Sequence, residues 1–296
     1  MAKDLRPVLW KLLGVSIGIF FVSGVLLLII LLLPEKELPL PAFPISNETG
    51  QSTTLGDQNT STNTQENEAK YQELQSLLES TLSQKKGNWS FLLTEPDTGK
   101  MIGSNAHRPQ NAASVMKVLV AALLLQRVEA GDMTLTDSLK GLPVQTHLQR
   151  MINISDNNSW AALNEYLGLS NLQKFAESIG MQDTNLFNNT ISSYDVNLLF
   201  TKILKGKILT EEHKNLLFSY MQQTETEDRI PTIVPKTITL YHKTGSLDYV
   251  VNDAAIILFP KRTVIFTVLS EEIAGYQTAV STVQTLTKAV VDFYSK

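Results

Sequence analysis

The amino-acid sequence predicts an α+β domain in which an antiparallel sheet is flanked by helices and joined to an all-helical lobe. Strand patterns lie at both ends of the region after residue 67, and helical patterns fill its middle. Turn sequences at 97–99 and 260–262 join neighbouring strands as hairpins, so these strands should pair antiparallel. Strands and helices segregated in this way are typical of α+β domains.

The first part of this domain is expected to begin with a helix at Glu68. Apolar residues from Tyr71 to Leu82 recur at helical spacing, and Gly87 follows as a stop. Residues 89–94 and 100–104 have the composition of strands. The next helix, 115–128, is strongly apolar, so most of its circumference should be buried.

The rest of the domain is predicted as a run of helices, then three strands, then one last helix. Helices are expected over residues 148–154, 160–167, 172–179, 196–204 and 211–221. Strands are expected over 238–241, 254–259 and 264–269, and the final helix over 278–293.

A candidate transmembrane helix precedes the domain, from Leu12 to Leu33. It contains no charged residue and would be about 33 Å long, enough to cross a bilayer. A cleaved signal peptide is the alternative, but the apolar run is long and lacks a small-x-small cleavage site. Lysine and arginine predominate before it, which predicts that residues 1–11 are a cytoplasmic tail. The chain is therefore expected to be a single-pass protein of the cell membrane, with everything after Leu33 extracytoplasmic.

Composition defines the remaining regions and excludes several classes of partner. Residues 34–67 are rich in Pro, Ser, Thr, Asn and Gln and are predicted to be a flexible extracytoplasmic linker, with the folded domain over 68–296. The formal net charge is −4 without a long basic run, so no nucleic-acid partner is expected. No protein partner is predicted. The chain has no cysteine, which excludes disulfides and thiolate metal sites.

The first chemical motif is Ser114-Val115-Met116-Lys117, which opens the apolar helix. Here Ser114 would lie at the positive end of the helix dipole, and Lys117 one turn later on the same face. Burial would lower the pKa of the amine and make it a base for the hydroxyl. The alternative is that Ser114 only caps the helix. A second Ser-x-x-Lys, Ser83 to Lys86, lies at a polar helix end and is interpreted as a solvated terminus.

Two tripeptides follow in order. Ser155-Asp156-Asn157 precedes a helix, and Lys243-Thr244-Gly245 follows an apolar strand. Separately, the first could be a capping cluster and the second a solvated strand end. Together with the Ser114 motif they supply a nucleophile, an amine to activate it, a second hydroxyl and a cation for a carboxylate. Serine β-lactamases and penicillin-binding enzymes use this set of groups.

From Glu68 onward the chain therefore resembles the class A β-lactamase and penicillin-binding protein superfamily, and Asn252-Asp253-Ala254 adds to the likeness. The resemblance implies a β-lactamase-like fold, no metal or organic cofactor, and these roles. Ser114 would be the acylated nucleophile, Lys117 its base and Ser155 a proton relay. The substrate would be bound by Asn157, Lys243, Thr244, Gly245, Ser246 and Arg229, and the backbone N–H groups of Ser114 and Ser246 would form the oxyanion hole.

One feature of the family is missing. Class A enzymes carry a Glu in a Glu-x-x-x-Asn pattern, which positions the water that deacylates the enzyme; residues 180–192 contain no Glu. Asp183 and Asp195 are the nearest carboxylates, and Asp195 is expected near a helix start. The interval from Ser114 to Ser155 is also short compared with the family that the chain resembles.

The resulting hypothesis is a membrane-anchored serine hydrolase that acts on β-lactams or on the peptide stems of peptidoglycan. It would open the amide through an acyl-enzyme on Ser114, and deacylation would be slow without the Glu. The alternatives are a penicillin-binding D-alanyl-D-alanine peptidase and a β-lactam- or peptidoglycan-binding sensor without turnover. The four histidines form no close pair of the kind that binds metals, so structural or solvated roles are expected for them.

Overall fold

A five-stranded antiparallel sheet with the order β2-β1-β9-β8-β7 forms the centre of the protein. We describe it from a computed structural model, in which residues 58–296 are described, and their side chains from residue 66 onward. The strands are β1 (Asn88–Thr94), β2 (Met101–Ser104), β7 (Thr239–Leu247), β8 (Val250–Phe259) and β9 (Arg262–Glu271). β7 is therefore an edge strand.

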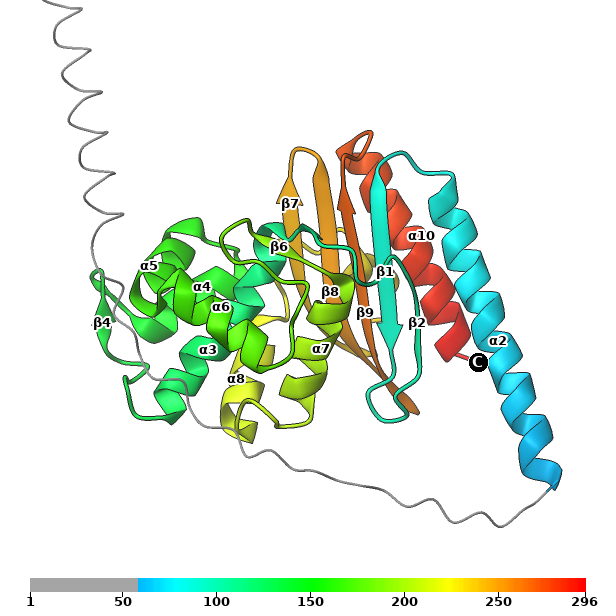
Figure 1. The fold of residues 1–296 in the computed structure, drawn as a ribbon, viewed down its shortest axis with the longest axis horizontal. Helices are drawn as coiled ribbons and strands as arrows, with labels where there is room; N and C mark the ends of the chain where they lie inside the picture. The colour runs from blue at the N-terminus through cyan, green and yellow to red at the C-terminus, as the bar shows by residue number, and fades with distance from the viewer. Residues whose placement is uncertain (1–57) are drawn as a thin grey trace, which may run out of the picture. The chain divides into compact units, whose positions relative to one another are not determined.

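Two helices from opposite ends of the described chain pack side by side on one face of this sheet (Figure 1). They are α2 (Gln58–Ser83) and α10 (Tyr276–Tyr294), and the short α9 (Ile230–Ile233) also contacts α10. Apolar side chains of these helices and of the sheet form one hydrophobic core. Leu78, Phe266 and Val283 are fully buried in it.

The helical lobe lies beside the other face of the sheet and has its own hydrophobic core (Figure 1). Its helices are α3 (Lys117–Glu129), α4 (Val144–Asn153), α5 (Asn157–Leu167), α6 (Leu169–Ser178), α7 (Ser193–Leu204) and α8 (Glu211–Tyr220). α3 is surrounded by the others: all its residues from Lys117 to Arg127 are buried. A helix that is apolar all round is stable only in such an interior.

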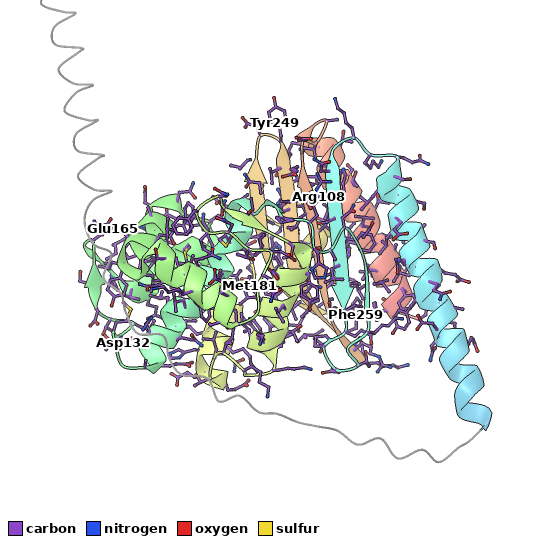
Figure 2. The ribbon with its side chains drawn as sticks, viewed as in Figure 1. Arg108, Asp132, Glu165, Met181, Tyr249 and Phe259 are labelled. Atoms are coloured by element: carbon purple, nitrogen blue, oxygen red, sulfur yellow. The ribbon has the colours of Figure 1, made fainter. Side chains whose placement is uncertain are left out.

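Two small sheets and a 3₁₀ turn complete the lobe. β3 (Gln110–Asn111) pairs with β6 (Thr190–Ile191), β4 (Ser138–Leu139) pairs with β5 (Leu142–Pro143), and the 3₁₀ turn η1 (Ala113–Met116) leads directly into α3. Figure 2 shows Met181 inside the lobe and Tyr249 at the tip of the β7–β8 hairpin, at the opposite end of the sheet from Phe259.

The α+β prediction is confirmed, and every helix and strand predicted for the domain is present. Several boundaries differ, and two of these differences matter most. α2 begins at Gln58 rather than near Glu68, because its first turns are polar and give no apolar periodicity. β7 continues to Leu247, so Lys243-Thr244-Gly245 lies inside the strand and not after it. The two small sheets were not predicted, since two-residue strands leave no pattern.

The predicted cytoplasmic tail, the predicted membrane helix Leu12 to Leu33 and residues 34–57 of the predicted linker lie outside the described residues. Within residues 58–296, no helix is both long and apolar enough to span a bilayer.

The carboxylate of Glu95 joins the two terminal helices to the sheet. This side chain follows β1, is 1% exposed, and accepts hydrogen bonds from Tyr71 of α2 and from Tyr294 of α10, the latter at 2.7 Å. Thr98 donates a further bond at 3.0 Å to its other oxygen. Burial, followed by the bond to Glu95, raises the pKa of the Tyr71 hydroxyl to about 12. A buried carboxylate is tolerated here because both of its oxygens are hydrogen bonded.

We expect Tyr294→Phe to lower the free energy of unfolding by about 2 kcal/mol, since it removes one hydrogen bond to a buried charged acceptor. Urea denaturation of the whole chain measures the change. Tyr249→Phe is the matched control, because Tyr249 is 69% exposed. Equal effects of the two substitutions would contradict the role given to Glu95.

Candidate active site

Ser114 is in the 3₁₀ turn η1, immediately before the buried helix α3. The residue before it, Ala113, has φ +45°, a left-handed conformation that alanine rarely adopts. The Asn111 side-chain oxygen accepts a 2.9 Å hydrogen bond from the Ala113 N–H and stabilises this turn. Strained backbone of this kind persists where surrounding contacts hold it, and it is concentrated at functional sites.

Two asparagines from distant parts of the chain hold the backbone that precedes Ser114. Asn252 of β8 is fully buried and donates to the carbonyls of Asn111 at 2.8 Å and Ala112 at 3.3 Å. Asn189 accepts the Ala112 N–H with its backbone carbonyl at 2.9 Å, and its side chain donates to the Ala113 carbonyl at 3.3 Å. Ser114 is thus fixed between the sheet and the 180–192 segment.

Gly245 lets the edge strand β7 approach the turn that carries Ser114. A Cβ atom at this position would lie 2.7 Å from the Ala112 carbonyl oxygen and 3.0 Å from the Ser114 nitrogen. Real Cβ atoms do not approach backbone so closely, so only glycine fits without moving η1 away from β7. The structure therefore gives a steric reason for glycine in the Lys-Thr-Gly motif.

Lys117 is the first residue of α3 and is 1% exposed. Its Nζ donates to the backbone carbonyl of Ser155 at 2.6 Å and to the Asn157 side-chain oxygen at 2.8 Å, and it lies 5.7 Å from the Trp160 ring centre. Ser114 and Lys117 are three residues apart across a 3₁₀ turn, a spacing that stacks the two side chains on one side.

The Ser155 loop connects α4 and α5 and faces both lysines. Ser155 has φ +55°, and its hydroxyl is hydrogen bonded by the Nζ of Lys243, while its carbonyl is bonded by Lys117. Asp156 caps α5 by accepting the Ser159 N–H at 2.9 Å and the Ser159 hydroxyl at 2.6 Å. These bonds lower the pKa of the Asp156 carboxyl, so it is a stable negative charge beside the loop.

Lys243 projects from β7 and is 2% exposed. Besides Ser155, its Nζ donates to the Thr244 carbonyl at 3.0 Å. Burial, followed by the charge of Lys117, lowers the pKa of Lys243 to about 7; Asp253 opposes this shift. Burial also lowers the pKa of Lys117 to about 8, opposed by Asp156. One of these two amines can thus lose its proton near neutral pH.

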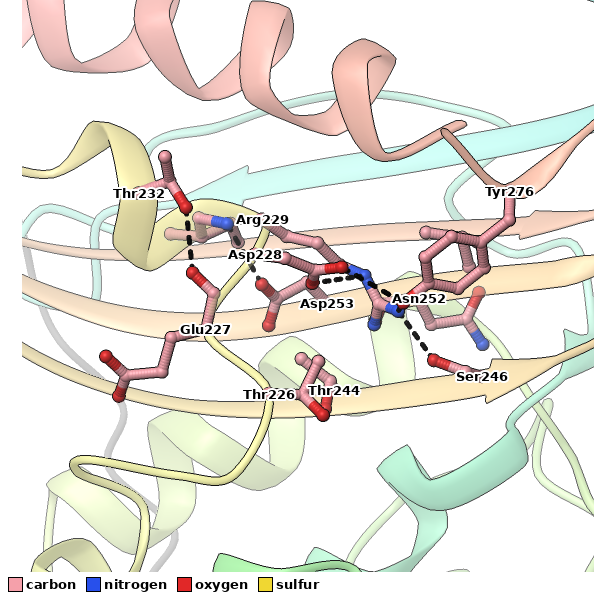
Figure 3. Close-up of polar contacts among 12 residues, drawn as sticks. Thr226, Glu227, Asp228, Arg229, Thr232, Thr244, Ser246, Asn252, Asp253 and Tyr276 are labelled. Atoms are coloured by element: carbon pink, nitrogen blue, oxygen red, sulfur yellow. Dashed lines mark hydrogen bonds and ion pairs between the residues drawn. The ribbon is translucent and has the colours of Figure 1, made fainter. Parts of the chain in front are cut away.

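Arg229 lies just before α9, and its side chain is 0% exposed. Figure 3 shows its guanidinium among Asn252, Ser246 and Tyr276. It donates to the Asn252 carbonyl at 2.7 Å and to the Ser246 hydroxyl. Arg229 therefore reaches the exposed end of β7 through Ser246 rather than directly.

The structure brings the residues of the three motifs together around Ser155, with Ser246 and Arg229 at the neighbouring end of β7. Thr244 is 7% exposed, one residue from Lys243. The proposed oxyanion N–H groups of Ser114 and Ser246 stay a prediction. The anchoring roles of Asn189 and Asn252 could not be predicted from the sequence, where Asn252 belongs only to the family likeness.

Other interpretations of the sequence can also be compared with the structure. The second Ser-x-x-Lys begins at the last residue of α2, where the exposed Ser83 hydroxyl donates to the Ser80 carbonyl, so it is the helix end that was predicted. Asp195 lies in the first turn of α7, as expected. It is 1% exposed, accepts the Asp183 N–H and the Thr184 hydroxyl, and burial raises the pKa of its carboxyl. One of its oxygens, Oδ2, accepts both bonds and so helps to hold the 180–192 segment.

Each of the four histidines has a hydrogen-bond partner. His107 meets Asp183 at 2.8 Å, His147 meets Ser159 at 3.1 Å, His213 meets Glu129 at 2.9 Å, and His242 meets Asp253 at 3.0 Å. Among the described residues, no group of three His, Asp or Glu side chains is arranged to hold a metal ion.

A serine at the start of a buried helix, next to an amine of lowered pKa in an α+β domain with an antiparallel sheet, is the arrangement of active-site serine enzymes. Comparison with protein families identifies the group: the model described as the beta-lactamase enzyme family matches residues 70–294. The chain belongs to this family. No curated protein matches the sequence.

Solved structures share the fold at low identity. A beta-lactamase from Xanthomonas campestris pv. campestris is 21% identical with a TM-score of 0.72, over 76% of this chain and 98% of that one. PBP-A is 20% identical with a TM-score of 0.72, over 75% and 96%. An ancestral class A beta-lactamase is 22% identical with a TM-score of 0.70, over 74% and 99%. The predicted superfamily and fold are confirmed.

We expect Gly245→Ala to lower the rate at which a fluorophosphonate labels Ser114 by about 100-fold, because the added Cβ displaces η1 by a fraction of an ångström or more. Labelling followed by intact mass measures the rate. Gly275→Ala is the control: a Cβ at Gly275 meets nothing within 4 Å, and labelling should be unchanged. Unchanged labelling in Gly245→Ala would show that the close approach is unimportant.

Proposed function

We propose that this protein is a serine hydrolase that opens β-lactam amides through an acyl-enzyme on Ser114. The observation that carries the proposal is the position of Ser155 between two buried amines. Lys117 bonds its carbonyl and Lys243 its hydroxyl. This geometry supports a route for a proton from the nucleophile to a leaving nitrogen.

In the proposed acylation step, neutral Lys117 takes the proton of the Ser114 hydroxyl, and Ser114 Oγ bonds to the carbonyl carbon of the substrate. The carbon–nitrogen bond then breaks, and the nitrogen takes a proton from the Ser155 hydroxyl. Lys117 then passes the proton that it took from Ser114 to Ser155, so the net result is the transfer of one proton from the nucleophile to the leaving nitrogen. The lowered pKa of Lys117 supports its role as the base.

The substrate should carry a carboxylate near the amide that is attacked, since Lys243, Thr244 and Ser246 lie on β7 beside Ser155. A bound carboxylate would favour the charged form of Lys243 and so leave Lys117 as the neutral amine. β-Lactams and the D-alanyl-D-alanine ends of peptidoglycan stems both meet this requirement.

Slow deacylation is part of the proposal. The 180–192 segment contains no Glu, and Asp195 is engaged in its own hydrogen bonds. Asn189 is the side chain of this segment that contacts the turn before Ser114, and its Oδ1 is buried without a hydrogen-bond partner. An amide oxygen can orient a water molecule but cannot take its proton at neutral pH. Hydrolysis of the acyl group would therefore lack a general base.

The same absence favours a second candidate, a penicillin-binding D-alanyl-D-alanine peptidase, and the shared fold with PBP-A is compatible with it. A sensor that keeps the acyl group without turnover is the third. We further propose that Leu12 to Leu33 anchors the chain in the cell membrane with residues 1–11 in the cytoplasm, which the apolar length and the preceding cations support.

The main test is incubation of the whole chain, in detergent, with a chromogenic cephalosporin while colour and intact mass are followed. We expect a mass adduct on Ser114 with little sustained colour, because the site has a base for acylation but no general base for deacylation. Ser114→Ala should form no adduct, and Ser83→Ala, in the other Ser-x-x-Lys, should behave as the unmodified protein. Sustained colour would indicate an efficient β-lactamase. The absence of both colour and adduct would refute the proposed function.

For a carboxylate substrate, the second-order rate constant of acylation should rise with pH to a maximum between about 7 and 8 and then fall. The reacting form needs a neutral Lys117, whose pKa is lowered to about 8, and a charged Lys243, whose pKa is lowered to about 7. Stopped-flow or quenched mass measurements give the profile, and a neutral phosphonate that lacks a carboxylate should show the rise without the fall. A midpoint near 10.5, the ordinary value for lysine, would be inconsistent with this mechanism.

A further inference from the structure

The guanidinium of Arg229 is held by three side chains, and the family resemblance gives no role to two of them, Asp228 and Tyr276. Its Nη2 lies 2.5 Å from the Ser246 hydroxyl and 2.9 Å from the Tyr276 hydroxyl, at the first residue of α10. Its Nε lies 3.4 Å from the Asp228 carboxylate, and its carbon Cζ lies 5.6 Å from the Tyr276 ring centre. Figure 3 shows Tyr276 and Ser246 on neighbouring sides of the guanidinium.

The chemistry of these groups fixes the direction of each hydrogen bond. A guanidinium only donates, so the hydroxyl oxygens of Ser246 and Tyr276 are both acceptors toward Arg229. Tyr276 must then donate its one proton elsewhere, and the Asp228 carboxylate accepts it at 3.0 Å. The Ser246 hydroxyl donates to no acceptor among the described residues, and Ser246 is exposed, so its proton is available to a solute.

Arg229 itself cannot reach a solute in this arrangement. It is 0% exposed, and its Nη1 is bonded to the Asn252 carbonyl at 2.7 Å. Rotation toward solvent would leave that carbonyl and the Tyr276 hydroxyl without their donor, a loss that is costly in a buried site. The positive charge therefore acts on the exposed end of β7 through the Ser246 hydroxyl.

We propose that Tyr276, together with Asp228, is a positioning residue for substrate recognition: it holds Arg229 so that Ser246 presents its hydroxyl proton to the carboxylate of the substrate. This inference rests on the proposed function, because that function supplies the carboxylate. Tyr276 touches neither the substrate nor the reacting atoms. By accepting a hydrogen bond from Arg229 Nη2, Tyr276 fixes the position of the guanidinium. The guanidinium then orients the Ser246 hydroxyl.

The test measures acylation of the whole chain by one β-lactam as the free carboxylate and as its methyl ester, recording the saturation constant and the limiting acylation rate separately. For the carboxylate, Tyr276→Phe should raise the saturation constant about 10-fold, the equivalent of one charge-assisted hydrogen bond, with the limiting rate within about twofold. For the ester neither quantity should change. Asp228→Asn should shift the same constant in the same direction.

Two comparisons separate positioning from a structural effect. In a Ser246→Ala background, Tyr276→Phe should not raise the saturation constant further, because Arg229 then has no serine hydroxyl to orient. Tyr294→Phe, which removes a hydroxyl from the other end of the same helix, should leave both constants unchanged. Additive effects in the double variant, equal losses for acid and ester, or no effect of Tyr276→Phe would each overturn the inference.

Equilibrium binding of the acid and the ester to Ser114→Ala distinguishes failure of this inference from failure of the proposed function. If Ser114→Ala binds the acid better than the ester and Tyr276→Phe abolishes this preference, the positioning role of Tyr276 is supported. If the unmodified protein also forms no Ser114 adduct, the proposed function alone fails. If Ser114→Ala binds the acid no better than the ester, the positioning role of Tyr276 is refuted, whatever the adduct experiment gives.

Discussion

The site depends on the burial of two amines, Lys117 and Lys243, against one serine. Water would keep both amines charged and apart, whereas here both are almost fully buried and bond to different atoms of Ser155. Burial lowers the pKa of both amines, and the positive charge of Lys117 adds to the lowering at Lys243. The left-handed backbone of Ser155 allows this, because it turns the carbonyl toward one amine and the hydroxyl toward the other.

Each part of the fold supplies one side of this arrangement. The helical lobe buries the start of α3 and so determines the environment of Lys117, and the sheet ends in an edge strand that carries Lys243. The turn η1 can approach β7 so closely because position 245 has no side chain. Asn252 then ties the sheet to the turn before Ser114 with two hydrogen bonds. The contacts that pack the sheet against η1 are therefore also the contacts that position Ser114.

Sequence alone predicted what local patterns record. The apolar circumference of α3 indicated a buried helix, and three motifs in order indicated a shared site. The position of Lys243 within β7 was missed because buried Lys and Thr interrupt the apolar pattern of a strand, and their partners come from the helical lobe. Asn189 and Arg229 act through contacts with residues 16 to 77 positions away, which no local pattern encodes.

The helix α10 has a tyrosine at each end: Tyr276 beside Ser246 and Tyr294 on Glu95. This helix has 19 residues and is about 28 Å long, so the two tyrosines lie at its opposite ends. Tyr71 of α2 donates a hydrogen bond to the same Glu95 carboxylate, at the Tyr294 end of α10. The same helix therefore ties the end of the described chain to the sheet at Glu95 and holds Arg229 beside Ser246.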